Sequence, residues 1–150
     1  MASIRSRIGE NMEDRYLFKA KFDDSDRWVK GQLVEVNDTY LIIPNHASKI
    51  LAGWFSTSNI IEVKKDTICQ CTGLKDKNGK LIWENDIMVA HLDDAYPEDE
   101  TYIRILWYES GFCSKEKGSE DISPIDKFDQ EHFEVCGNIF DNPDLLESEE

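Results

Sequence analysis

The chain has 150 residues, of which 40% are hydrophobic and 11% aromatic. This composition predicts a folded protein of one domain, or of two small ones that share a core. The formal net charge is −14. Because phosphate binding requires clustered lysines and arginines, direct binding to nucleic acid or to an anionic membrane is disfavoured.

The negative charge is unevenly distributed along the chain. Residues 1–90 hold 13 basic and 13 acidic side chains, whereas residues 91–150 hold 4 basic and 18 acidic ones. We interpret the acidic excess as a solvated surface that aids solubility. The alternative is an acidic face that docks on a basic partner or imitates DNA.

The start of the chain carries Arg5 and Arg7 and lacks a long apolar run, which does not fit a secretory signal. No stretch approaches the ~18 apolar residues of a membrane span. We therefore expect a cytoplasmic protein with free thiols. Residues 1–14 lack sustained periodicity and are expected to form a flexible arm.

Strand signals begin after this arm. Alternating or continuous apolar runs predict short strands, in chain order at 16–22, 28–36, 40–43, 60–63, 67–72, 81–83, 87–92, 102–108, 112–114 and 133–140. The intervening stretches 45–59, 93–100 and 115–126 predict loops, and Asn78-Gly79 predicts a tight turn. Strands of this length and spacing are typical of a small barrel or sandwich.

Helical signals are short and lie near the end of the chain. Ile125, Phe128 and Phe133 are compatible with a short helix or a covering loop. Asn142 and Pro143 predict one helical turn, with the asparagine as its cap and the proline at its first position.

Three segments together carry a family resemblance. The first is Phe18–Lys21 followed by Trp28–Leu33, the second is TICQCTGLKDKNGKLIWENDI at 67–87, and the third is FEVCGNIFDNPDLL at 133–146. In this order and spacing the chain resembles the YopX family of phage and prophage proteins, over about residues 16–146.

The resemblance implies a fold and a biological context. It implies a mostly β protein with an SH3-type barrel, encoded in a phage or prophage region and therefore expected in the cytoplasm of the bacterial host. Together with the strand pattern it gives our fold prediction, an all-β protein with an SH3-type small barrel, an N-terminal β extension and short helical turns. We expect residues 15–150 to form a single YopX-like β domain, with a possible subdivision into 15–66 and a barrel part at 67–146. No catalytic residues carry over from the family.

The resemblance also indicates which residues form a structural signature rather than a reactive site. These residues, mostly turn formers, are Trp28, Gly31, Gly73, Asn78, Gly79, Asp86, Gly137, Asn138 and Pro143. The chain departs from the family at Cys71, where an aromatic residue is usual, and at Asn85, where glycine is frequent. Asparagine tolerates the left-handed conformation, so the turn at Asn85 is retained.

Reactive side chains are present without a pattern that assigns them a reaction. Zinc would need partners from Cys69, Cys71, Cys113, Cys136, His46, His91 and His132. The spacing of Cys69 and Cys71 is too short for a usual zinc pair, and buried free thiols are the simpler interpretation. Cys113 or Cys136 with a histidine could form a nucleophile and its base, although no signature surrounds either cysteine. We therefore predict no metal, no cofactor and no catalytic residue.

The charged clusters are interpreted in the same way. Asp93-Asp94, Glu98-Asp99-Glu100 and Glu120-Asp121 are pairs that a chain with 31 acidic residues contains without selection, and the loop at 93–100 lacks the calcium-binding pattern of an EF-hand. The lysines of 75–80 are expected to form a solubilising turn.

These observations leave three function classes. The leading hypothesis is a non-enzymatic accessory protein that acts through contact with an unknown host or phage protein. The second is a nucleic-acid-binding module, with the turn at 75–80 and Trp83 as its contact. The third is a cryptic enzyme that uses a cysteine or a carboxylate. Self-association is also open, because small barrels can expose sheet edges.

Overall fold

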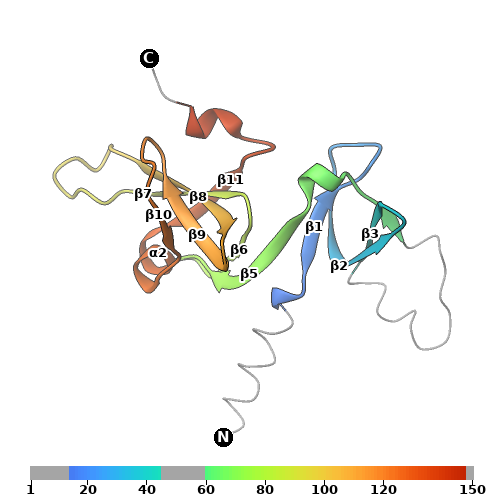
Figure 1. Cartoon of the computed structure of the whole chain (residues 1–150). Helices are drawn as coiled ribbons and strands as arrows, with labels where there is room; N and C mark the ends of the chain where they lie inside the picture. The colour runs from blue at the N-terminus through green and yellow to red at the C-terminus, as the bar shows by residue number, and fades with distance from the viewer. Residues whose placement is uncertain (1–13, 45–59, 148–150) are drawn as a thin grey trace, which may run out of the picture. The chain divides into compact units, whose positions relative to one another are not determined.

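The computed structural model describes residues 14–44 and 60–147. The arm expected at 1–14 lies outside the described residues except for Asp14, and so do the loop expected at 45–59 and His46. The chain forms two compact units, Met1–Cys71 and Thr72–Glu150. Strand β5 passes from the first unit to the second (Figure 1).

The first unit is an antiparallel sheet in which β1 lies between β2 and the beginning of β5. Its strands follow the order β4-β3-β2-β1-β5, and a 3-10 turn, η3, precedes β5. The bounds are β1 Phe18–Lys21, β2 Trp28–Val36, β3 Thr39–Pro44, β4 Ile61–Glu62, η3 Lys65–Thr67 and β5 Cys69–Lys75.

Local sequence explains the hairpins of this unit. The β2–β3 turn places Asn37 and Asp38 at φ 49° and 62°, and these two residue types tolerate left-handed geometry. Pairing follows without a slip from Val36 opposite Thr39 to Gly31 opposite Pro44. The alternating side chains bury one small core, made by Ala20, Val29, Ile42 and Val63.

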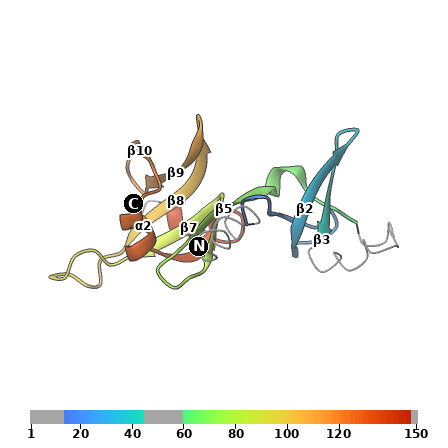
Figure 2. The ribbon, with the colours of Figure 1, turned by 90° about the horizontal axis from the view of Figure 1, so that it is seen from below.

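The second unit contains a five-stranded antiparallel sheet in the order β10-β9-β8-β7-β11. Figure 2 labels strands β7 to β10 of this sheet. The hairpin strand β6 is not part of this sheet but pairs with β5 as the last strand of the six-stranded sheet, and the short helix α2 lies between β10 and β11 in the chain. The bounds are β6 Leu81–Trp83, β7 Asp86–Ala90, β8 Thr101–Tyr108, β9 Gly111–Glu116, β10 Ile122–Pro124, α2 Lys127–His132, β11 Glu134–Asn138 and η4 Pro143–Leu146.

One face of this sheet carries the core of the second unit. Met88 and Ala90 of β7 and Ile103 and Ile105 of β8 lie in a single cluster with Ile82 and Phe133. The alternate residues of β8 therefore lie on the opposite face. This division of β8 and β9 into two faces positions the two pockets described below.

The prediction of a mainly β protein is confirmed. The described strands form open antiparallel sheets, not a closed barrel, so the SH3-type barrel stays a prediction. Nearly every strand expected from the sequence is present, including β2 with the predicted bounds. Residues 115–126, however, are not only a loop, because Ile122–Pro124 pair with β9 as β10.

Helix α2 begins with a capping box. The Asp126 carboxylate accepts from the Asp129 amide at 2.9 Å, and the Asp129 carboxylate accepts from the Asp126 amide at 3.2 Å. Each carboxylate thus satisfies one backbone donor at the helix start. The sequence left open whether a helix or a loop stands here, and the Asp-x-x-Asp spacing is the signal that distinguishes them.

Candidate functional site

The lysine-rich turn at 75–80 is stabilised by hydrogen bonds to the side chain of Asp76, which is buried. One carboxylate oxygen accepts from the amides of Asn78 and Lys80, both at 2.9 Å, and the other accepts from the amide of Val135 at 2.9 Å. Gly79 has a φ of +80°, as the Asn-Gly turn predicts. Sequence reasoning missed Asp76, although an aspartate two residues before the asparagine is an Asx-turn signal.

The turn between β6 and β7 is also a structural element. Asp86 is buried and accepts from the Trp83 amide at 2.8 Å. Asn85 has a φ of 70°. Its backbone N–H donates to the Ile105 carbonyl at 2.7 Å, and its backbone carbonyl accepts from the Ile139 amide at 3.0 Å. Trp83 is only 4% exposed, so it does not offer the base-stacking surface that the nucleic-acid alternative requires.

The chain turns sharply at the end of β11, and hydrogen bonds to Asn138 hold this turn. The Asn138 side-chain oxygen accepts from the amides of Phe140 and Asp141, both at 2.9 Å. Asn142 stands at the cap position of η4 with Pro143 first in the turn, as predicted, but its side chain makes no cap bond. It accepts instead from the Asn138 amide at 3.3 Å.

The remaining signature residues lie in or beside β1, β2 and β5. Trp28 is covered by the ammonium groups of Lys19 and Lys21, at 4.9 and 5.5 Å from its ring centre. Gly31 allows β2 to approach β3, because a Cβ there would lie 2.7 Å from the Ile43 carbonyl carbon. Gly73 interrupts β5 at φ 78°.

Cys71, which replaces the usual aromatic residue, is fully buried. Cys69 is also buried, and its thiol donates to the Thr67 carbonyl at 3.3 Å. Cys113 is buried as well, and its thiol lies 3.7 Å from the Gly111 carbonyl oxygen. Within residues 14–44 and 60–147, no three histidine, cysteine or acidic side chains are grouped as metal ligands would be.

The structure places several titratable groups around Glu100. Its carboxylate lies 4.0 Å from His91 Nε2 and accepts a hydrogen bond from the Tyr102 hydroxyl. That bond, with burial and the carboxylate charge, raises the pKa of Tyr102 to about 12. Burial is the main cause that raises the pKa of Cys136, and neighbouring carboxylates including Glu100 add to it.

The groups around Glu100 do not include an activated nucleophile. The Cys136 thiol donates to the Ile87 carbonyl at 3.4 Å. A thiolate, not a thiol, is the nucleophile, so a raised pKa makes Cys136 a poor one near neutral pH. His132, the other described histidine, stacks on Phe128 at 4.1 Å between ring centres, and its Nδ1 lies 2.9 Å from the Phe128 carbonyl oxygen.

A groove in the second unit combines apolar and acidic side chains. It has a volume of about 270 Å³ and lies beside β8, β9, β10 and α2. We call it the acidic groove and define it by its apolar residues Leu92, Ile103, Phe128 and Phe133 and its carboxylates Glu116, Asp121 and Asp129. None of the described residues that line it is a lysine or an arginine.

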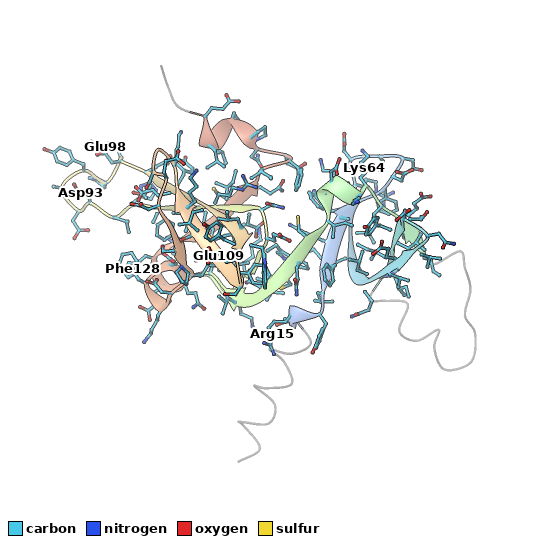
Figure 3. The ribbon with its side chains drawn as sticks, in the orientation of Figure 1. Arg15, Lys64, Asp93, Glu98, Glu109 and Phe128 are labelled. Atoms are coloured by element: carbon cyan, nitrogen blue, oxygen red, sulfur yellow. The ribbon has the colours of Figure 1, made fainter. Side chains whose placement is uncertain are left out.

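Two apolar side chains of the acidic groove are unusually open to solvent. Leu92 is 43% exposed and Phe128 is 49% exposed. Figure 3 shows Phe128 projecting from α2, apart from Asp93 and Glu98 of the β7–β8 loop. Burial is the main cause that raises the pKa of Asp129, and the Asp126 charge adds to it while the backbone bond from Asp126 opposes it. A partly dehydrated carboxylate beside exposed apolar surface is suited to a cationic, apolar ligand.

Comparison with known proteins assigns the family. The family described as "YopX protein" matches residues 17–147. The chain belongs to the YopX family. The three sequence segments therefore identified it correctly, and in the structure they correspond to the β1–β2 hairpin, the β5–β7 region with its two turns, and β11 with η4.

A solved structure supports the fold. Protein EF1440 from Enterococcus faecalis is similar to this chain at 24% identity, with a TM-score of 0.50, over 87% of this chain and 96% of that one. A comparison with curated proteins finds no match. Over the described residues, no helix has the length and apolar character needed to cross a membrane.

Proposed function

We propose that this YopX protein is a non-enzymatic accessory protein of a phage or prophage that acts in the bacterial cytoplasm by binding another protein. The acidic groove is the proposed docking site. Its occupant is a segment of a host or phage protein that carries lysines or arginines beside a large apolar side chain. The observation that carries this proposal is the lining of the groove, which joins exposed Leu92 and Phe128 to three carboxylates.

The chemistry of the acidic groove selects the occupant. Burying Leu92 and Phe128 would supply hydrophobic free energy, at roughly 25 cal/mol for each Å² of apolar surface removed from water. Glu116, Asp121 and Asp129 would attract cations and repel acidic segments, which gives orientation and partner choice. A pocket for one large side chain, rimmed by charge, is the usual anatomy of a protein interface.

Two further considerations support the proposal. Family membership supports the phage or prophage origin. The open five-stranded sheet of the second unit is the part of the chain to which the SH3-type barrel prediction applies. The raised pKa values of Cys136 and Tyr102 argue against thiolate or phenolate chemistry at these two residues.

Site-specific photo-crosslinking in the bacterial host tests the docking site. A photoreactive amino acid replaces Phe128 in the acidic groove, and in a matched control it replaces Tyr108, which is similarly exposed at 47%. The proposal predicts one predominant crosslinked protein, obtained from position 128 only. The crosslinked peptide of that partner should be rich in lysine or arginine. Equal crosslinking from both positions, or a crosslinked peptide that is acidic, would contradict it.

Charge reversal then tests the electrostatic part. Asp121→Lys should weaken binding of the identified partner by about tenfold or more, because it places a cation in a groove that selects cations. Glu98→Lys makes the same change of net charge outside the groove and should have a much smaller effect. If the two variants weaken binding equally, the interaction depends on overall charge and not on this groove. Sedimentation velocity of the protein alone shows whether a second copy is the occupant.

A further inference from the structure

The few cations of residues 91–150 are concentrated in one place. Residues 91–150 hold 4 basic side chains against 18 acidic ones, yet three of the four, Arg104, Lys115 and Lys117, line a single pocket of about 310 Å³. Carboxylates dominate residues 91–150. Chance placement would therefore favour isolated cations, each paired with acidic neighbours. The clustering therefore calls for a physical explanation.

The strands direct these cations away from the core. Arg104 stands between Ile103 and Ile105, which both belong to the core cluster. Successive side chains of a strand alternate between faces, so Arg104 belongs to the face opposite the core. Lys115 is the direct partner of Arg104 in the β8–β9 ladder. Like charges directly opposite each other destabilise an antiparallel pair, so this placement costs stability unless an anion offsets it.

Arg104 is held in position without being neutralised. Its terminal NH₂ group donates to the Asn85 side-chain oxygen at 3.1 Å, a neutral partner. Its Nε is buried and has no hydrogen-bond partner among the described residues. A guanidinium presents five donors in a fixed plane, so Arg104 retains capacity for an oxyanion after it has bonded to Asn85.

The two lysines are also only lightly engaged. Lys115 pairs with Glu120 at 3.3 Å, but that glutamate side chain is 97% exposed and can turn into solvent. Lys117 lies over the Tyr102 ring, 5.5 Å from its centre. Glu116 also borders the pocket, and Leu146 of η4 adds an apolar wall. The described lining thus holds three cations and two carboxylates.

We propose that this pocket binds a small molecule or group bearing a compact oxyanion, a phosphate or a carboxylate. Arg104 would bind two of its oxygens, Lys115 and Lys117 would supply point charges, and Leu146 would contact the apolar remainder of the ligand. The two linings share Glu116, but the cations of this site lie on the other face of β8 and β9 from the acidic groove, so the site does not depend on the docking proposal. The anion arrives either free or attached to a protein, as a phosphorylated side chain.

The test is a titration of the full-length protein at constant ionic strength, followed by backbone amide NMR shifts. The probes are inorganic phosphate, citrate and a phosphoserine peptide, with chloride as the ionic-strength control. The proposal predicts saturable shifts at β8, β9 and η4 with at least one oxyanion and none with chloride. Tighter binding of the phosphopeptide than of inorganic phosphate assigns the protein-borne source, and the reverse assigns a free ligand. Absence of saturation up to tens of millimolar with all three probes overturns the proposal.

Matched variants locate the effect. Arg104→Gln and Lys117→Gln should each weaken oxyanion binding by about tenfold, the usual loss for a charged hydrogen bond. Lys127→Gln removes the fourth cation of this segment, which pairs with Glu131 on α2, and should leave binding unchanged. Lys117→Gln keeps the test decisive if Arg104→Gln fails to fold. Equal losses in Lys117→Gln and Lys127→Gln would show a non-specific charge effect and reject the pocket.

Discussion

The Asp76 carboxylate accepts a hydrogen bond from the backbone amide of Val135, 59 residues later in the chain, at 2.9 Å. The same side chain closes the 75–80 turn through Asn78 and Lys80. One buried carboxylate therefore joins two of the three family segments. Asp76, in the second of these segments, therefore holds the β5–β6 hairpin against β11.

Asp76→Ala should be strongly destabilising. It leaves three backbone donors without their acceptor in a region where Asp76 is only 6% exposed, and we expect a loss of about 3 kcal/mol in the free energy of unfolding. Urea denaturation measures it, with Asp94→Ala in the exposed β7–β8 loop as the control. A loss equal to that of the control would show that the Asp76 network contributes no stability.

Gly137→Ala should clash with a side chain and not with the backbone. A Cβ at Gly137 would lie 2.7 Å from the Asn142 Cγ, so we expect a cost of about 1–3 kcal/mol. In an Asn142→Ala background much of this cost should disappear, because the clashing group is gone. A double-mutant cycle on thermal unfolding measures the coupling, and strictly additive losses would refute the contact.

Gly31→Ala should be harder to accommodate than Gly137→Ala. The obstacle at Gly31 is the backbone of β3 at Ile43 and Pro44, which cannot rotate away. We expect a loss of roughly 3 kcal/mol or more, expressed as unfolding of the first unit. Gly111→Ala is the matched control, because a Cβ there meets nothing within 4 Å. Hydrogen exchange resolved by segment would show which unit is affected, and a stable β1–β3 sheet in Gly31→Ala would contradict the expectation.

Cys136 should alkylate only at high pH. Its pKa is raised above that of an ordinary cysteine thiol, mainly by burial, so the rate of reaction with iodoacetamide should rise at a higher pH than for the same thiol in the unfolded chain. Because the folded state holds the proton more tightly than the unfolded state, this thiol favours folding less as pH rises from the unfolded through the folded pKa. Cys136→Ser should lack this alkaline loss of stability. Peptide mass spectrometry follows the alkylation, and a midpoint no higher than that of Cys136 in the urea-unfolded protein would contradict the raised pKa.

The local structure and the family could be predicted from the sequence, but the two pockets could not. Asn78-Gly79, Asn85 and Pro143 each have a backbone preference that acts within a few residues, and each turn stands where it was predicted. The acidic groove was not predicted, because it requires Leu92, Asp121 and Phe128 to meet from separate elements. The β10 strand was missed for the same reason, since its pairing with β9 is not visible in three residues.

The sequence by itself determined that the protein is mainly β, that it belongs to the YopX family, and where its charge lies along the chain. These properties follow from short-range periodicity, turn chemistry and composition. Only the tertiary structure decided that Arg104, Lys115 and Lys117 share one pocket, and that carboxylates and exposed apolar side chains share another. Strand register and side-chain alternation bring distant residues together, and their effect depends on which strands pair, which a single sequence does not specify.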